Sequence, residues 1–294
     1  MELNDSQGRI TPVHSLRARL LLGFAVVAIL LILDRDHDLL SLFPFYRDLN
    51  QAYTFYVLQG GRSLLQMALV VVAVALLGRQ SLRSAGRELG FSASLLRGLA
   101  FGFGAATVMF VGFALTMPFK VPSDIVALLY LAGLSPLSEE VLYRAFGVGT
   151  LRDRCGAPTW LALLIPATIF GLAHVGQGAT WSENMALFAL TGSGGLFFGW
   201  FYLRWQRNLW VPFFLHAGMN LSWELFDVSS NAIGGWWPFV LQTSAIVIGI
   251  LATLKFAPRR AASITVEVAA QAFAADAPLR SARPNRGAGP PGST

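Results

Sequence analysis

Long apolar stretches alternate with short polar ones along most of the chain. Most of these stretches approach the roughly 17 to 25 residues that a helix needs to cross the hydrocarbon core of a bilayer. The pattern predicts an all-α fold, a polytopic membrane helix bundle of about eight transmembrane helices. The predicted spans cover residues 17–33, 63–78, 95–117, 125–148, 158–175, 184–203, 208–226 and 237–256.

Composition supports a membrane protein. Hydrophobic residues make up 54% of the 294 residues and charged residues 13%, against about 25% charged residues in ordinary soluble domains. These values exclude a typical soluble globule and a disordered chain. The single cysteine, Cys155, has no partner within the chain, which excludes a disulfide scaffold, and we interpret it as an unpaired loop thiol.

The two ends of the chain need separate interpretation. The first span follows Arg17 and Arg19 like a signal peptide, but the next residues are DRDHD and no small-residue cleavage site follows. We therefore expect a retained first helix. The sequence predicts four parts: an N-terminal three-span region (1–124), a candidate catalytic core (125–226), a last span (227–257) and a disordered cytoplasmic tail (258–294).

The distribution of Lys and Arg predicts the orientation. Most of those outside the spans fall at the N-terminus, in the second, fourth and sixth loops, and after the last span. By the positive-inside rule both termini are cytoplasmic, and we expect a multi-pass protein of a bacterial cytoplasmic membrane. The net charge of +6 is scattered between apolar runs, so we expect no nucleic-acid partner.

The fourth span contains three ionisable residues in SPLSEEVLYRAFG: Glu139, Glu140 and Arg144. Three charges at mid-span oppose insertion by about 8 to 10 kcal/mol, and the flanking apolar residues return only about 3 to 6 kcal/mol. The charged face of this helix must therefore point into a protein-lined cavity rather than into lipid.

Helical spacing separates the two glutamates. Adjacent residues point about 100° apart, whereas residues four apart share a face. Glu140 and Arg144 should therefore form an intrahelical ion pair, which leaves Glu139 as the free carboxylate. The alternative is that both glutamates only join helices.

Two further spans carry polar groups suited to acid–base chemistry. His174 follows Phe170 by four residues in the fifth span, and His216 and Asn220 share one helical stripe in the seventh. A single such residue more often makes an interhelical hydrogen bond. Together with the acidic pair, they supply a base for water, a proton shuttle and oxyanion donors. Serine-elbow and HExxH zinc motifs are absent, so the set suits a hydrolase without a covalent nucleophile.

Three motifs in this order resemble one known family. EExxxR, FxxxH and HxxxN on the fourth, fifth and seventh spans are similar to those of the intramembrane CAAX protease and bacteriocin-processing family of glutamic endopeptidases. This family includes the type II CAAX prenyl endopeptidases and abortive-infection-like proteins. The motif residues are Glu139, Glu140, Arg144, Phe170, His174, His216 and Asn220.

The resemblance implies a glutamate-dependent peptidase that acts within or beside the membrane. Glu139 would activate the attacking water with help from His174, and His216 and Asn220 would stabilise the tetrahedral oxyanion. The ion pair of the fourth span would shape the site. The implied partners are the lipid bilayer and a membrane-associated peptide or protein, of which prenylated CAAX-type peptides are the family's best-known class.

Alternatives remain open at this point. The chain could be a non-catalytic scaffold or immunity protein of the same fold, or a proton-coupled transporter that uses Glu139 and His174 as a relay. We expect no cofactor. The alternative is zinc held by Glu139, His174 and His216.

One expectation conflicts with the mechanism. If the fourth and fifth spans are stacked simply between the two membrane faces, Glu139 and His174 lie about 15 Å apart along the membrane normal. The proposed chemistry requires them to meet.

Overall fold

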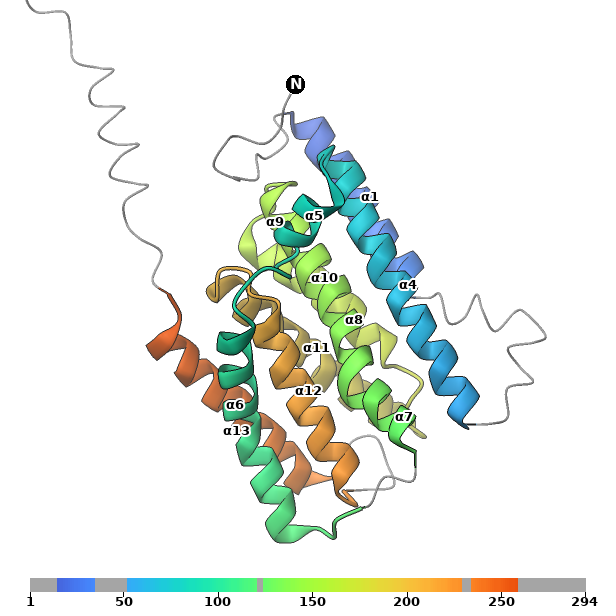
Figure 1. Cartoon of the computed structure of the whole chain (residues 1–294), viewed down its shortest axis with the longest axis vertical. Coiled ribbons are helices and arrows are strands. Elements are labelled where there is room, and N and C mark those ends of the chain that lie inside the picture. The colour runs from blue at the N-terminus through green and yellow to red at the C-terminus, as the bar shows by residue number, and fades with distance from the viewer. Residues whose placement is uncertain (1–14, 35–51, 121–123, 229–233, 259–294) are drawn as a thin grey trace, which may run out of the picture. The chain divides into compact units, whose positions relative to one another are not determined.

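The computed structural model describes residues 15–34, 52–120, 124–228 and 234–258 (Figure 1). These residues form a helical bundle without a β-sheet, as predicted, and their long helical segments lie at all eight predicted positions. The predicted tail lies outside the described residues apart from residue 258. The segments are α1 (Leu16–Asp34), α4 (Ala52–Gly78), α6 (Leu95–Thr116), a continuous helix over Ile125–Asp153, α10 (Thr159–Ala173), α11 (Trp181–Arg204), α12 (Trp210–Leu225) and α13 (Trp236–Phe256).

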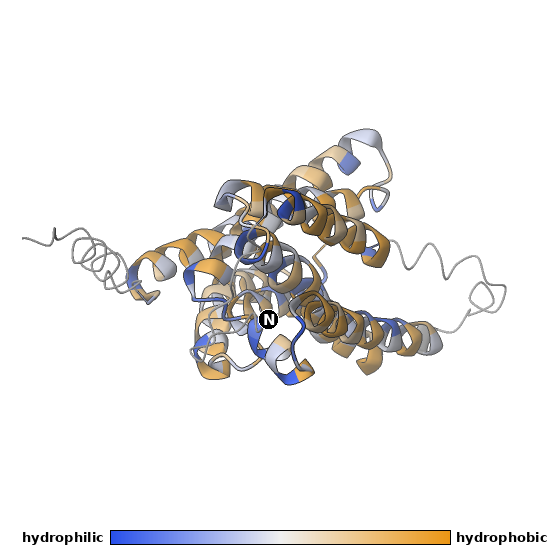
Figure 2. Cartoon of the chain, turned by 90° about the horizontal axis from the view of Figure 1, so that it is seen from above, coloured by the Kyte–Doolittle hydropathy of each residue, from blue (hydrophilic) through white to orange (hydrophobic). Residues whose placement is uncertain are grey.

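The described helices confirm a polytopic bundle. Six of them are long and apolar enough to cross a membrane, and Figure 2 shows apolar residues along the helices with hydrophilic residues mainly near their ends. α10 has only 15 residues, a length of about 22 Å. This helix is shorter than the roughly 30 Å hydrocarbon core, so one of its ends lies inside the membrane if the other reaches the surface.

α4 begins 11 residues earlier than the predicted span 63–78. The sequence YVLQGGRS interrupts the apolar run, which is why the pattern placed the start too late. The polar side chains of this segment are turned into the bundle: Gln59, Ser63 and Gln66 are all buried. A buried polar face does not end a helix, because the backbone hydrogen bonds continue beneath it.

The helix over Ile125–Asp153 changes its winding around the acidic pair. It consists of α7 (Ile125–Leu129), η1 (Tyr130–Leu134), α8 (Ser135–Glu139), η2 (Glu140–Val148) and α9 (Gly149–Asp153), of which η1 and η2 are π-helical. π-Helical turns are rare and often lie at functional sites. Here they flank the single α-helical turn that ends at Glu139.

α6 and α12 approach each other closely because glycines line their contact. A Cβ on Gly98 or Gly102 would lie about 2.4 Å from Trp210 or from the backbone of Leu215. Only hydrogen fits at these two positions. The close contact holds α12, and therefore its polar stripe, against the rest of the bundle.

Contacts between loops show that the helices alternate in direction. Arg154, after α9, binds Glu88 of the short helix α5 (Leu82–Glu88) with both donors, at 2.5 and 2.7 Å, and Arg207 pairs with Asp153 at 2.7 Å. The second, fourth and sixth loops therefore meet at one end of the bundle. This agrees with the alternation predicted from the basic residues, whereas the assignment of this end to the cytoplasm stays a prediction.

Candidate active site

Glu140 is the buried member of the acidic pair. Its side chain is 0% exposed, and its Oε1 lies 3.1 Å from Nη1 of Arg144 and 2.9 Å from Nδ1 of His216. The intrahelical ion pair expected from the spacing is therefore present, and α12 adds a second partner. Both contacts fix Glu140 away from solvent, in agreement with a supporting role.

The guanidinium of Arg144 is enclosed by aromatic rings. Its Cζ lies 4.4 Å from the ring centroid of Phe170 and 5.3 Å from that of Phe198, and the side chain is 1% exposed. Stacking of a guanidinium on aromatic faces stabilises a charge that lipid would not tolerate. This contact gives the aromatic residue of the FxxxH motif a structural reason, which the sequence pattern alone did not supply.

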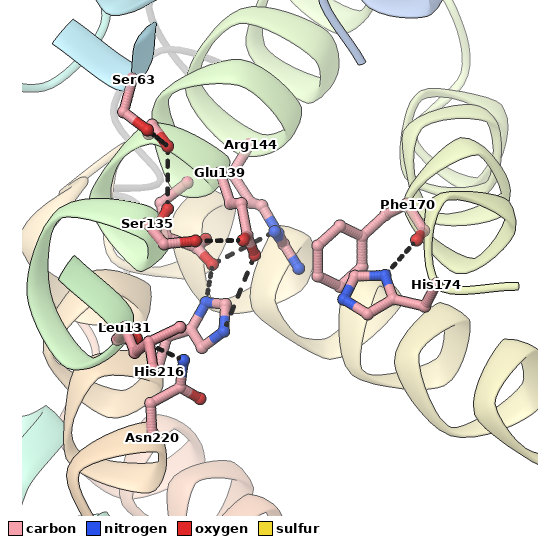
Figure 3. A network of polar contacts seen from close by, with 11 residues as sticks. Ser63, Leu131, Ser135, Glu139, Arg144, Phe170, His174, His216 and Asn220 are labelled. Carbon is pink, nitrogen blue, oxygen red and sulfur yellow. Dashed lines mark hydrogen bonds and ion pairs between the residues drawn. The ribbon is translucent and has the colours of Figure 1, made fainter. Parts of the chain in front are cut away.

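Glu139 is the accessible carboxylate, with a side chain that is 27% exposed. Ser135, one turn earlier, donates its hydroxyl to Glu139 Oε1 at 2.9 Å. Nε2 of His216 lies 3.8 Å from Glu139 Oε2, too far for a hydrogen bond but within reach of an ion pair. His216 therefore stands between the two glutamates, as Figure 3 shows.

Glu139 and His174 line the same cavity, which has a volume of about 590 Å³. A conserved contact is not needed to explain this arrangement; helix packing is sufficient. Tyr143, one turn beyond Glu139, packs edge to face on Phe170, with ring centroids 4.9 Å apart. Because the two helices run in opposite directions, the residue one turn before Tyr143 lies level with the residue one turn after Phe170.

The expected 15 Å separation between Glu139 and His174 is therefore wrong. The fourth helix continues to Asp153 instead of ending near residue 148, and α10 begins at Thr159. Counted from the loop that joins them, Glu139 and His174 lie about 21 and 22 Å along their helices. The error came from measuring each residue from a different membrane face.

His174 caps the end of α10 with a fixed ring. Its Nδ1 lies 2.8 Å from the carbonyl oxygen of Phe170. Because a carbonyl can only accept, Nδ1 carries the proton, and Nε2 of the neutral ring has a free lone pair. This is the tautomer that can accept a proton from water.

His216 and Asn220 are held by partners on the fourth helix. Nδ1 of His216 donates to the carboxylate of Glu140, so Nε2 can act as a donor only in the imidazolium form. Asn220 donates one N–H to the carbonyl oxygen of Leu131 in η1 at 3.0 Å. A side-chain amide has two N–H groups, so one further donor of Asn220 is available.

The cavity also contains polar residues from the two N-terminal helices, which the sequence analysis did not single out. Asp34 at the end of α1 and Arg62 and Gln66 on α4 line it together with Glu139. Asp34 accepts a hydrogen bond from the phenol of Tyr143. The cost argument used for the fourth span would have identified Arg62 as well, because it is a cation within a predicted membrane helix.

The zinc alternative does not fit the observed arrangement. Among the residues that the structure describes, no group of three His, Cys, Asp or Glu side chains is placed to hold a metal ion. Nδ1 of His174 is bound to a carbonyl oxygen and Nδ1 of His216 to Glu140. We therefore derive no step that uses a metal.

Comparison with known proteins covers the same part of the chain. Residues 120–222 match the model of a family described as type II CAAX prenyl endopeptidase Rce1-like. The chain carries an Rce1-like domain. All seven motif residues lie within this domain, whereas Asp34, Arg62 and Gln66 lie outside it. No curated protein and no solved structure matches the chain.

Proposed function

We propose that the chain is an intramembrane endopeptidase that uses Glu139 as a general base on water. The observation that carries the proposal is the difference between two adjacent carboxylates. Glu140 is fully buried and bound by Arg144 and His216, whereas Glu139 is accessible and lines a cavity with His174. A buried, bound carboxylate suits a supporting role, and an accessible one beside an imidazole suits proton transfer.

Catalysis would proceed in two steps. Glu139 and Nε2 of His174 bind one water molecule, and Glu139 takes a proton as the water oxygen attacks the scissile carbonyl carbon. The imidazolium of His216 and the second N–H of Asn220 donate to the developing oxyanion. The tetrahedral intermediate then collapses, the C–N bond breaks, and the proton passes from Glu139 to the leaving amine.

The substrate would be a peptide or protein associated with the membrane. Support comes from the Rce1-like domain and from the position of the cavity within a set of membrane-crossing helices. A prenylated CAAX-type peptide is the first substrate to test, because that chemistry is in the description of the matched family.

Cleavage of such a peptide by purified protein in detergent tests the proposal. Wild-type protein should cleave it, and Glu139→Gln should not, while Glu224→Gln should keep wild-type turnover. Glu224 is a matched control because it is a half-buried glutamate on α12 that does not line the cavity. No cleavage of prenylated or unprenylated peptides by wild-type protein would favour the scaffold or transporter alternatives.

The same preparation tests the absence of a metal cofactor. We propose a metal-free reaction, so turnover should persist after chelation, and elemental analysis of active protein should find substoichiometric zinc. Stoichiometric zinc together with loss of activity on chelation would contradict this part of the proposal.

A further inference from the structure

The chain between α10 and α11 forms one wall of the cavity. His174, Val175, Gly176 and Gln177 all line it. This segment therefore positions His174 from its C-terminal side, as the Phe170 carbonyl does from within α10.

Helix packing places this segment at depth in the bundle. Gly171 of α10 packs directly against Gly192 of α11, and Ala167 packs against Gly195. His174 is therefore level with about the second turn of α11, and the start of α11 at Trp181 lies about 12 Å further along. Within a membrane, such backbone must have its polar groups satisfied by protein or by a water-filled cavity.

One side chain satisfies most of these groups. Oδ1 of Asn184, in the first turn of α11, accepts the N–H groups of Gly176 at 2.7 Å and Gly178 at 3.0 Å. Its Nδ2 donates to the carbonyl oxygens of Gly178 at 3.1 Å and Thr180 at 3.0 Å. Gly176 has a φ of 105°, so the segment turns sharply where Asn184 holds it.

We propose that Asn184 is a positioning residue for the reaction, acting through the backbone that follows His174. This inference rests on the proposed function. The four hydrogen bonds fix the path of residues 176–180, and this path determines where α10 ends and where the His174 ring faces. A displacement of about 1 Å in a reacting group can lower a rate by about two orders of magnitude.

Three variants separate this role from a general effect on folding. Asn184→Ala removes all four hydrogen bonds, whereas Asn184→Asp keeps the two acceptor contacts and loses the two donors. Asn208→Ala is the matched control. Asn208 is also buried and also fastens a turn, donating to Ser94 O and accepting from Trp210 N, but at the other end of α11.

Two readouts are needed, and one of them does not require activity. The first is the rate at which diethyl pyrocarbonate modifies His174, followed by mass spectrometry with His216 as the internal reference. The second is kcat and KM for a cleaved peptide, expressed per folded molecule, with the melting temperature measured alongside.

We expect Asn184→Ala to speed modification of His174 several-fold, with His216 unchanged. It should lower kcat roughly 10- to 100-fold with KM within about twofold. Asn184→Asp should lie between Asn184→Ala and the wild type. Asn208→Ala should lower the melting temperature without changing either readout.

Unchanged His174 reactivity in Asn184→Ala would overturn the proposal, as would normal kcat in an active enzyme. If wild-type protein cleaves nothing, the proposed function fails, and the modification rate still decides whether Asn184 positions His174.

Discussion

Glu139 and His174 face one cavity from two antiparallel helices, one turn beyond the contact between Tyr143 and Phe170. The aromatic contact sets the relative height of the helices, and the height brings the carboxylate and the imidazole to the same level. The site is therefore built by packing between helices, and the acid–base pair depends on apolar contacts one turn away.

Replacement of Arg144 by leucine should destabilise the protein. The change would leave Glu140 buried without its cation, and breaking a buried pair costs about 3 to 5 kcal/mol. We expect a lower yield of folded protein and a lower melting temperature, with lost activity as a consequence. Arg204→Leu, at an exposed position of α11, is the control and should have little effect. A normal melting temperature with abolished turnover would instead place Arg144 in the chemistry.

Asn220→Ala tests the oxyanion role. Removal of one oxyanion donor should lower kcat about 10² to 10³-fold. The lost hydrogen bond to Leu131 should cost only about 1 kcal/mol of stability, so the protein should still fold. A rate loss of less than tenfold, measured on protein with near-normal melting temperature, would remove Asn220 from this role.

The glycines of α6 provide a matched pair for the packing of α12. Gly102→Ala places a methyl group about 2.4 Å from the backbone of Phe214 and Leu215 and should cost about 1 to 3 kcal/mol. Gly104→Ala, two residues further along α6, meets nothing within 4 Å and should stay within about 0.5 kcal/mol of wild type. Equal melting temperatures for the two variants would contradict the close approach of α6 and α12.

Cys155 should be unreactive in the folded protein, although it is a free thiol in a loop. Burial raises its pKa from 9.0 to about 11. Only the thiolate is nucleophilic, and a rise of two pKa units lowers its fraction at pH 8 about 100-fold. Maleimide labelling should therefore be slow at pH 8, rise with pH toward 11, and become fast in denaturant. Rapid stoichiometric labelling of folded protein at pH 8 would show that the thiol is accessible.

Features that depend on a single helix could be predicted from the sequence. The pair between Glu140 and Arg144 follows from their spacing, and the accessibility of Glu139 follows from its position beside that pair. The spans were also predictable, because each apolar run is long enough to be recognised without knowledge of its neighbours.

Features that depend on contacts between helices could not. The levels of Glu139 and His174 are set by the packing of Tyr143 on Phe170, which helix length and composition do not encode. The start of α4 was missed for a similar reason. Its polar residues, such as Gln66, are tolerated only because the bundle buries them.

The account depends most on Glu139 and His174 acting on the same water molecule. The direct measurement is kcat for Glu139→Gln, His174→Gln and the double variant, each corrected for the folded fraction. We predict that each single variant loses about 10² to 10⁴-fold, and that the double variant is no more than about tenfold slower than the slower single variant, because both residues serve one step. Losses that multiply in the double variant, or near-normal turnover in either single variant, would contradict the account.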